Sequence, residues 1–384
     1  MMDINMPINI APTTRNFVNV GQALFAIEEH NGKTIVYDCG GESRQTVSTV
    51  LPYVLKKNDQ IDILFISHYD KDHINGIPAL LQYCNVKHIV LPMIEHATRI
   101  MSLLYLPHNS FEYEFTLNPT RTIRGLLKMF HERYRYLEND RTYPYIHFVA
   151  QADGNNSAFS IESPVLIGNM GDNQIILPYR AVLIDNLDDW IYVPYNRRLM
   201  TKNEEMDFYD LLGVPFGCSE EEFLDHWKHN WPHAKIEIPY WNHPYYYRNI
   251  VKEAWATATN FRKGINDYSM TLYSGHAYNK AKDGCLYTGD YNAHKYIDEL
   301  KRFYIHVEDQ IGIVQIPHHG SRNNYDPQLI IPSATHVISN KEIPHKRSDV
   351  KYDYVWNDIE RKGEKVVGTW NAPLYLNMTN NNNT

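Results

Sequence analysis

Six consecutive residues, 68–73, carry two imidazoles and two carboxylates in the order HYDKDH. They follow the apolar run 61–67, which is typical of a buried strand, and they precede a proline-containing segment typical of a helix start. A strand-to-helix loop holds side chains on a rigid scaffold, next to a helix N-terminus that favours anionic ligands. Imidazoles and carboxylates at this density indicate a divalent metal site. The candidate ligands are His68, Asp70, Asp72 and His73.

Two later segments bring the same kinds of side chain to the ends of predicted strands. The short strand 285–288 leads through a glycine to Asp290, whose carboxylate can point at a metal from the strand end. The apolar run 311–316 leads to the adjacent histidines His318 and His319. Each cluster alone also has an ordinary explanation as a turn or a surface pair. Three clusters at strand ends together favour one shared metal site.

The elements that must position these clusters lie near the two ends of the chain. Patterns of apolar residues and turn signals predict a helix near 46–55 and helices near 122–138 and 220–231 in the middle of the chain. The predicted strands that flank the clusters are 21–28, 34–37, 61–67, 88–92, 270–273, 285–288, 311–316 and 337–339.

The organisation of the chain follows from where the ligand clusters fall. We expect one domain formed by residues 1–95 and 262–376, closed by the two ends of the chain. The region 96–261 is crowded with aromatic and amide residues and is interpreted as an insertion or an elaborated cap. Its aromatic side chains either pack the core of that region or offer a surface for stacking bases. The asparagine-rich tail 377–384 is expected to be disordered.

Composition sets broad limits on the class of protein. The chain has 384 residues, 43% hydrophobic and 21% charged, with a formal net charge of -8. This balance gives no global basic field that would attract DNA or anionic lipid, although a local basic groove is compatible with it. We find no signal peptide and no apolar stretch long enough to span a bilayer. The four scattered cysteines indicate reduced thiols, so we expect a soluble, cytoplasmic protein without membrane partners.

Taken together, four motifs resemble those of the metallo-β-lactamase superfamily. They are YDCG with Asp38, the HYDKDH loop, TGD ending at Asp290, and PHHGS at 317–321. The segments 20–22 and 266–272 are similar to those of the ComEC-like branch, as is the late strand at 337–340. That branch comprises hydrolase domains of competence DNA-uptake channels and their stand-alone relatives. The resemblance covers both ends of the chain but not the middle, and it implies an α/β fold, the four-layer αββα sandwich with metals at one edge and a large middle insertion.

The resemblance also implies roles for individual residues. One metal would be surrounded by Asp72, His73, Asp290 and one of the two histidines at 318 and 319. A second metal would be served by His68, Asp70 and the bridging Asp290. We favour His319 as the ligand because it lies nearer the glycine loop, with His318 as its hydrogen-bonding partner; the reverse assignment stays open. Asp38 would orient the ligand loop through hydrogen bonds.

Two departures from the superfamily pattern affect the metal. Hydrolases with a complete dizinc site usually have histidine where Asp70 stands, and a further histidine where this chain has Asn266 and Asp267. His276 is an alternative ligand, although it is expected in a turn after the strand 270–273. A site with more oxygen ligands and fewer imidazole ligands favours a hard metal such as Mn²⁺, although Zn²⁺ is also compatible with it. We expect one or two ions per chain.

The predicted chemistry is hydrolysis. A divalent metal activates a water molecule near neutral pH and neutralises the oxygens of an in-line displacement, which suits phosphodiesters best. We therefore expect a phosphodiesterase or nuclease acting on nucleic acid or a nucleotide-type substrate. The alternatives are a hydrolase of another ester, such as a lactone or thioester, and a partner-binding protein with a degenerate metal site.

Catalytic roles are expected for Asp72, Asp38 and His345. His345 would contact phosphate or donate a proton to the leaving group, or it is an ordinary surface histidine. Ser321 and Arg322 are candidate phosphate contacts with an equally plausible loop role. The basic pair at 346–347 would add local positive potential.

Overall fold

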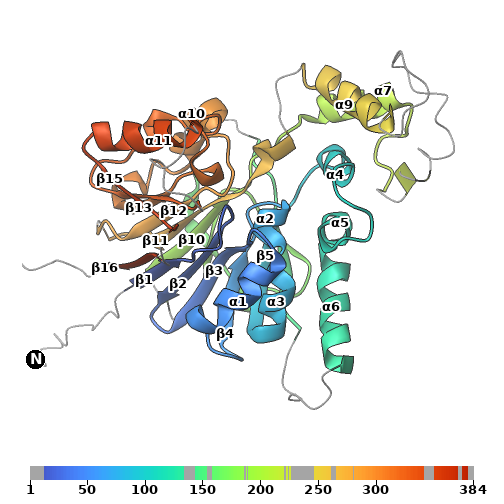
Figure 1. Cartoon of the computed structure of the whole chain (residues 1–384). Helices are drawn as coiled ribbons and strands as arrows, with labels where there is room; N and C mark the ends of the chain where they lie inside the picture. The colour runs from blue at the N-terminus through green and yellow to red at the C-terminus, as the bar shows by residue number, and fades with distance from the viewer. Residues whose placement is uncertain are drawn as a thin grey trace, which may run out of the picture.

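Two eight-stranded sheets pack face to face and carry helices on their outer faces (Figure 1). The expected four-layer αββα sandwich is thereby confirmed. The computed structural model describes residues 13–133, 143–153, 158–185, 187, 189–219, 222–223, 225, 246–260, 265–279, 281–340, 350–370 and 374–378.

The first sheet is antiparallel on one side and parallel on the other. Its parallel strands are joined through helices α1 (Arg44–Val54) and α3 (Ile77–Tyr83), so their carboxyl ends lie at one edge of the sheet. The central strands are apolar and buried on both faces, as parallel strands under helices require. In spatial order the strands are β16 (Leu374–Met378), β1 (Thr13–Phe17), β2 (Phe25–His30), β3 (Lys33–Cys39), β4 (Gln60–Phe65), β5 (Asn85–Pro92), β6 (Tyr145–Val149) and β8 (Gln174–Ile176).

The second sheet has the same mixed character. From β12 to β15 the strands are parallel, and helices α10 (Ala293–Phe303) and α11 (Val350–Arg361) cover their outer face (Figure 1). In spatial order its strands are β15 (Lys365–Gly368), β14 (Thr335–Ile338), β13 (Ile311–Gln315), β12 (Gly284–Tyr287), β11 (Thr271–His276), β10 (Trp190–Tyr195), β9 (Arg180–Leu183) and β7 (Ser160–Leu166).

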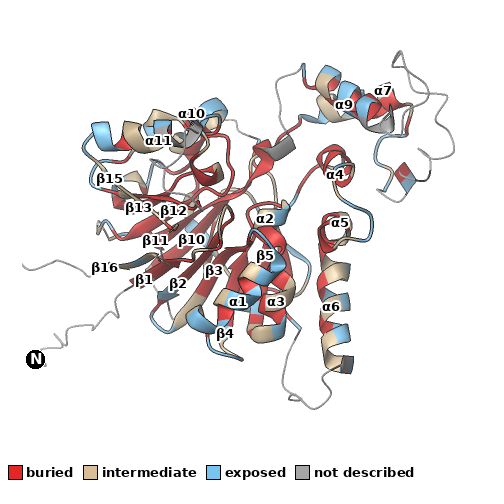
Figure 2. Cartoon of the chain, viewed as in Figure 1, coloured by how far each residue is buried: buried red, intermediate tan, exposed pale blue. Residues whose placement is uncertain are grey.

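The two sheets meet in a core of large side chains, which Figure 2 shows as buried strands. The rings of Tyr37 and Tyr287 stack across it with their centroids 4.8 Å apart. Arg15 is wholly buried nearby and pairs with Glu28 at 2.7 Å, while its other nitrogens donate to backbone carbonyls of the second sheet. A buried charge of this kind is tolerated only when fully paired. Arg15 and Glu28 both belong to the first sheet, so the hydrogen bonds from Arg15 to Asp283 and Ser274 are the contacts that link the two sheets here.

The region 96–261, expected to be an insertion or an elaborated cap, contributes strands to both sheets. Strands β6 and β8 extend the first sheet, and β7, β9 and β10 extend the second. Strands β8 and β9 are short and β7 is largely exposed or half-buried, so these three lack the continuous apolar run that marks a central strand, whereas β10 is wholly buried. The helices that lie outside the sheets are α4 (His96–Leu103), α5 (Phe111–Leu117), α6 (Pro119–Arg133), α7 (Lys202–Leu212) and α9 (Tyr246–Ala258).

The expected helices near 46–55 and 122–138 are present as α1 and α6, whereas α4, α5, α7, α9, α10 and α11 were not predicted. Helix α1 starts after Ser43, whose side chain accepts a hydrogen bond from the backbone N–H of Thr46. The expected helix at 220–231 lies mostly outside the described residues, and β16 includes the first two residues of the expected tail. The short helices are α2 (Lys71–Ile74), η1 (Ile167–Asn169), η3 (Ile265–Tyr268), η4 (Glu308–Gln310), η5 (His318–Gly320) and η6 (Pro327–Leu329).

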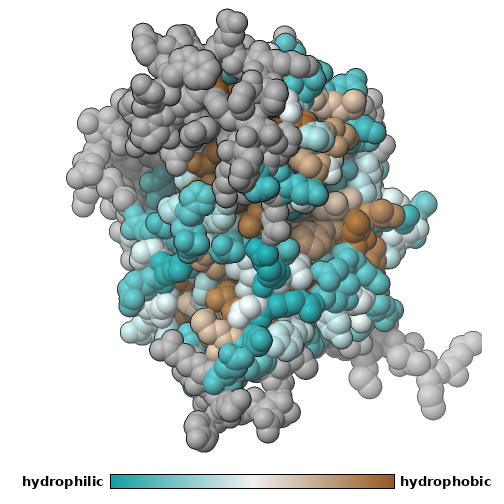
Figure 3. All heavy atoms as spheres, turned by 90° about the vertical axis from the view of Figure 1, so that its right-hand side faces the viewer, coloured by the Kyte–Doolittle hydropathy of each residue, from teal (hydrophilic) through white to brown (hydrophobic). Residues whose placement is uncertain are grey.

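The surface carries apolar side chains in small areas among hydrophilic ones on the face shown in Figure 3. Within the described part of the chain, every helix is too short or too polar to cross a membrane.

Candidate metal centre

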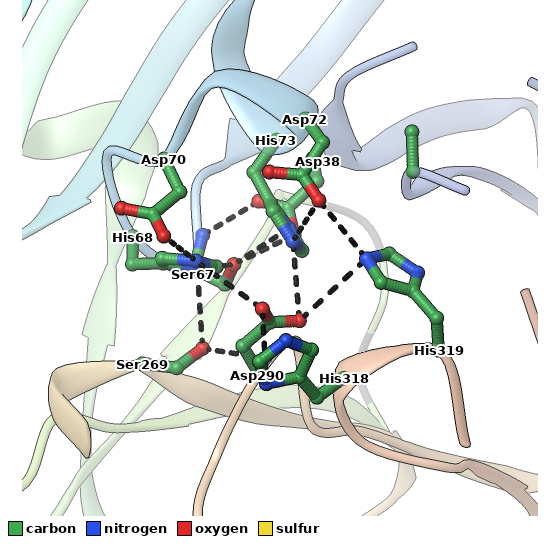
Figure 4. A network of polar contacts seen from close by, with 12 residues as sticks. Asp38, Ser67, His68, Asp70, Asp72, His73, Ser269, Asp290, His318 and His319 are labelled. Carbon is green, nitrogen blue, oxygen red and sulfur yellow. Dashed lines mark hydrogen bonds and ion pairs between the residues drawn. The ribbon is translucent and has the colours of Figure 1, made fainter. Parts of the chain in front are cut away.

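The three ligand clusters meet at one edge of the sandwich (Figure 4). The loop 68–73 follows β4 in the first sheet, and Asp290 and the histidine pair follow β12 and β13 in the second. Within each sheet the parallel strands end at one edge, and the packing of the two sheets brings these edges together. The topology therefore explains how residues more than 200 positions apart come together.

Two glycines allow the loops to approach closely. A methyl group on Gly40 would overlap the backbone of Asp72, so only glycine fits beside the ligand loop. Gly289 has a φ of +54°, and a methyl group there would overlap the side chains of Ser269 and Ser67. Gly40 thus lets two loops of the first sheet approach, and Gly289 lets a loop of the second sheet lie against Ser67 of the first.

Asp290 divides its carboxylate between two sets of ligands. Its Oδ1 atom lies 3.2 Å from His73 Nε2 and 4.0 Å from His319 Nε2. Its Oδ2 atom lies 3.6 Å from His318 Nδ1 and 3.8 Å from His68 Nε2. We call these two halves of the centre the His73 side and the His68 side.

Each side has a further carboxylate. On the His73 side, Asp72 Oδ2 lies 3.1 Å from His319 Nε2 and 3.9 Å from His73 Nε2. On the His68 side, Asp70 Oδ2 lies 3.7 Å from His68 Nε2. Each side thus offers two imidazole nitrogens, one aspartate and one oxygen of Asp290, a donor set suited to a first-row divalent metal.

Hydrogen bonds fix the direction of three of the imidazoles. His73 Nδ1 lies 2.7 Å from a carboxylate oxygen of Asp38, and His319 Nδ1 lies 2.9 Å from the carbonyl oxygen of Ser339. Because both partners are acceptors, each Nδ1 carries the proton and each Nε2 presents its lone pair to the centre. The second nitrogen of His319 is therefore held by Ser339 and not by His318.

Ser67 connects Asp38 to the third imidazole. Its hydroxyl donates to Asp38 Oδ2 at 2.6 Å, and Asp38 also accepts from the Ser67 backbone N–H at 2.7 Å. The single hydroxyl proton is then used, so Ser67 Oγ accepts the hydrogen bond from His68 Nδ1 at 2.9 Å. This arrangement turns His68 Nε2 toward the centre as well.

The carboxylates of the centre are charged despite their burial. Burial alone would raise the pKa of Asp290, but the imidazoles, with His73 foremost, hold that pKa well below its usual range. Burial is likewise outweighed at Asp72, where His73 and then His319 lower the pKa to about 2. Conversely, Asp290, Asp38 and Asp72 raise the pKa of His73 well above its usual value against the effect of burial. The centre is thus built to hold positive charge.

Several buried polar atoms of the centre lack a hydrogen-bond partner among the described residues. Leaving such atoms unsatisfied costs free energy unless a ligand contacts them. They converge on Asp290 and are of the type that binds metals, so these residues fit a divalent ion. The atoms are His68 Nε2, His73 Nε2, His318 Nδ1 and Asp290 Oδ1.

Other sequence candidates lie elsewhere. His276 is the last residue of β11 and not part of a turn, and carboxylates of Asp189 and Asp283 contact its two ring nitrogens at 2.9 and 3.1 Å. His276 is therefore not a candidate ligand of this centre. His345 lies outside the described residues, as does the basic pair 346–347.

Arg322 and Asp267, which lie near the sequence motifs, contact other side chains of the protein. The guanidinium of Arg322 lies over the ring of Tyr354, 4.4 Å from its centroid. Asp267 contacts Asn292 and Lys295, both at 2.8 Å, and the side chain of Asn266 lies outside the described residues. The sequence did not predict that Ser67 and Ser339 position imidazoles. For Ser67, its location directly before His68 could have indicated this role.

A polar cavity of about 310 Å³ opens beside the His73 side. It is lined by Gln22, Gly41, Glu42, Lys71 and Asp72. Lys71 is exposed, so a cation lies next to Asp72 at the cavity beside the centre.

Known proteins share parts of these features. A family model described as "Metallo-beta-lactamase superfamily" matches residues 20–99, which include the ligand loop. Cleavage and polyadenylation specificity factor 73 of Drosophila melanogaster is 39% identical over 69 residues, which are 18% of this chain and 10% of that protein. The chain therefore spans about a tenth of the length of this relative.

Two solved structures align over nearly the whole chain. YhfI of Bacillus subtilis, a metallo-β-lactamase fold protein, has a TM-score of 0.40 and 8% identity, with 96% of this chain and 100% of that chain covered. Igni18, a metallo hydrolase of Ignicoccus hospitalis, has a TM-score of 0.36 and 10% identity, with coverage of 95% and 98%. The family model supports the metallo-β-lactamase superfamily, and the ComEC-like branch stays an expectation.

Proposed function

We propose that this chain is a metal-dependent phosphodiesterase that acts on nucleic acid or a nucleotide-type substrate. The observation that carries the proposal is the Asp290 carboxylate, shared between two sets of buried imidazole nitrogens at the edge of the sandwich. Asp72, His73, His319 and Asp290 would hold a divalent ion, Mn²⁺ or Zn²⁺, on the His73 side.

Some residues of the centre would bind the metal ion, and others would orient the residues that bind it. A divalent ion bound here supplies activation of water and neutralises charge on the phosphoryl oxygens. Asp38 holds the His73 ring and the Ser339 carbonyl holds the His319 ring, so both ligand nitrogens are oriented in advance. Asp72 has 36% of its side chain exposed, so its carboxylate can also accept a hydrogen bond from water on the substrate side. His345 stays a proposed proton donor to the leaving group.

The cavity beside Asp72 favours a polar substrate over an acyl ester. Its lining offers an amide, a carboxylate and a cation, from Gln22, Glu42 and Lys71. Sugar hydroxyls and a phosphate neighbouring the scissile one would meet polar side chains there, with Lys71 as the cation. A relative named for cleavage and polyadenylation supports the same substrate class.

A substrate panel tests this proposal. The full chain loaded with Mn²⁺ or Zn²⁺ should hydrolyse bis-p-nitrophenyl phosphate and leave p-nitrophenyl acetate and a lactone untouched. Asp72→Asn and His73→Ala should each reduce the rate at least about 100-fold, with circular dichroism unchanged. Asp207→Asn, an exposed aspartate of α7, is the matched control and should retain the rate.

Three outcomes would overturn the proposal. Preferential cleavage of the acyl ester or lactone would assign the chain to that class of hydrolase. Undiminished phosphodiester cleavage in Asp72→Asn would remove the centre from the reaction. Less than one metal per chain, together with no hydrolysis of any substrate, would favour the partner-binding alternative.

A further inference from the structure

We propose that the cavity beside Asp72 binds the ribose of the nucleotide next to the scissile phosphate, and that Glu42 selects ribose over deoxyribose by accepting a hydrogen bond from the 2′-hydroxyl. The inference rests on the proposed phosphodiesterase function and adds to it the sugar that the substrate carries. Glu42 would determine specificity, because it contacts the sugar and not the phosphoryl group.

The cavity lies between the ligand loop and two other loops of the first sheet. Lys71 and Asp72 belong to the ligand loop, whereas Gln22 lies between β1 and β2, and Glu42 lies between β3 and α1. A backbone hydrogen bond joins two of these loops, since the N–H of Leu24 donates to the carbonyl of Asp72 at 3.2 Å. A sugar attached to a phosphate at Asp72 therefore enters a cavity that Gln22 and Glu42 also line.

The position of Glu42 is fixed by its neighbours. Its backbone N–H donates to the carbonyl of Val20 at 3.0 Å. The buried side chain of Asn75 donates to the carbonyl of Gly41 at 2.6 Å and accepts from the N–H of Gly41 at 2.9 Å. A methyl group on Gly21 would overlap the side chain of Glu42, so this side chain lies directly over the glycine. Part of the conformational freedom of Glu42 is thus already lost before a ligand binds, which favours binding.

The side chains of the cavity favour a sugar over a base or a second phosphate. Bases are bound mainly by stacking on aromatic rings, whereas four of the five lining residues, Gln22, Glu42, Lys71 and Asp72, have polar or charged side chains. The Glu42 carboxylate repels a phosphate but accepts hydrogen bonds from hydroxyl groups. The volume of about 310 Å³ is at the lower end for ligand sites, so it suits a single sugar and not a longer stretch of a strand.

The 2′-hydroxyl is the group by which a protein tells ribose from deoxyribose. An ionised carboxylate is an acceptor only, and its hydrogen bond with a hydroxyl is stronger than one between neutral groups. In dinucleotide-binding folds an acidic side chain accepts from the ribose 2′-hydroxyl in this way. Glu42 is exposed, so its hydrogen bond to the sugar replaces one to water. We therefore expect a moderate preference for ribose, about 10-fold.

Kinetics with matched dinucleotides test the inference. The full chain loaded with Mn²⁺ is given uridylyl-uridine and the two versions that lack one or the other 2′-hydroxyl. Removing one of these hydroxyls should lower kcat/KM at least about 10-fold, and removing the other should have a smaller effect. Glu42→Ala should abolish this difference, and Glu42→Gln, which keeps an oxygen acceptor without the charge, should reduce it. Glu162→Gln, at an exposed glutamate of β7, is the matched control and should retain it.

A second variant and a binding measurement support the kinetics. Gly21→Ala should displace Glu42 and weaken the preference for ribose, whereas Gly32→Ala, at a glycine that also has a positive φ but open space, should retain it. Calorimetry on the full chain loaded with Mn²⁺ compares uridine 3′-monophosphate and uridine 5′-monophosphate with their 2′-deoxy counterparts. One of the two pairs should show at least about 10-fold tighter binding of the ribonucleotide, and Glu42→Ala should remove this difference.

Equal cleavage of all three dinucleotides by the wild-type chain would overturn the inference and leave the proposed function standing. A preference for ribose that persists in Glu42→Ala would also overturn it. Faster cleavage of every dinucleotide alike in Glu42→Ala would mean that Glu42 only repels the phosphate, which contradicts the inference. Ribonucleotide binding that depends on Glu42, without cleavage of any dinucleotide, would refute the proposed function alone. Neither binding nor cleavage would refute both.

Discussion

Replacing Asp38 with asparagine should weaken metal binding by about 10–100-fold without unfolding the protein. Asp38 is wholly buried and contacts His73 Nδ1 at 2.7 Å, and it accepts two hydrogen bonds from Ser67 at 2.6 and 2.7 Å. Asparagine keeps the shape but turns one accepting oxygen into an NH₂ donor. Either His73 or Ser67 then faces a donor where it needs an acceptor.

Two effects set the cost in stability, and they act in the same direction. One buried donor left unsatisfied costs about 1–3 kcal/mol. The variant also removes one of three carboxylates, Asp38, Asp72 and Asp290, that raise the pKa of the His73 imidazole. The charged imidazole then loses part of the attraction that stabilises it. We therefore expect the free energy of unfolding to fall by about 1–3 kcal/mol without metal, and the stabilisation gained on adding Mn²⁺ to shrink.

Urea unfolding with and without Mn²⁺, together with metal titration, measures both effects. Asp62→Asn is the matched control, because Asp62 is also a buried carboxylate and sits in β4, but its partners are Lys33, Lys87 and the backbone N–H of Thr34. It should lower stability and leave metal affinity unchanged. Equal metal affinity in Asp38→Asn and the wild type would refute the positioning role of Asp38.

Three further changes test other parts of the structure. Gly289→Ala should lower the free energy of unfolding by more than about 2 kcal/mol, because left-handed backbone strain adds to a steric clash. Gly32→Ala has open space around the new methyl group and should lower it by about 1 kcal/mol; urea unfolding measures both. Burial lowers the pKa of His147 to about 4 in the folded chain, below its value in the unfolded chain. The free energy of unfolding should therefore fall by about 1–3 kcal/mol as the pH drops from 6.5 to 4, and His147→Gln should flatten this pH dependence. Lys71→Gln should raise the KM for a nucleotide phosphodiester several-fold relative to bis-p-nitrophenyl phosphate, while the exposed control Lys57→Gln should not; equal changes for both substrates would argue against the cavity as a subsite.

The fold and the grouping of the clusters were largely predictable from strand ends. The apolar run before His68 and the one before His318 mark central parallel strands, and parallel strands in one sheet end at the same edge. Asp290 and His318 follow neighbouring parallel strands of one sheet, so their approach was predictable, whereas their meeting with the loop 68–73 depends on how the two sheets pack. The edge strands β7 and β8 were not predictable, because their exposed residues carry no clear period and their pairing depends on neighbours far along the chain.

The division of the centre into the His73 side and the His68 side could not be predicted from the sequence. It depends on the backbone angles of His318 and His319 and on which oxygen of Asp290 each ring reaches. The Ser339 contact uses a backbone carbonyl 20 residues away from its histidine, and a carbonyl has no residue-type signal. His276 shows the opposite case, in which a ligand-type residue at a strand end pairs with other carboxylates.

The most direct measurement is anomalous diffraction from a crystal of the full chain soaked in MnCl₂. We expect a strong anomalous peak on the His73 side of the Asp290 carboxylate. A soaked crystal that diffracts well and has no anomalous peak at Asp290 would contradict the assignment of this centre as a metal site.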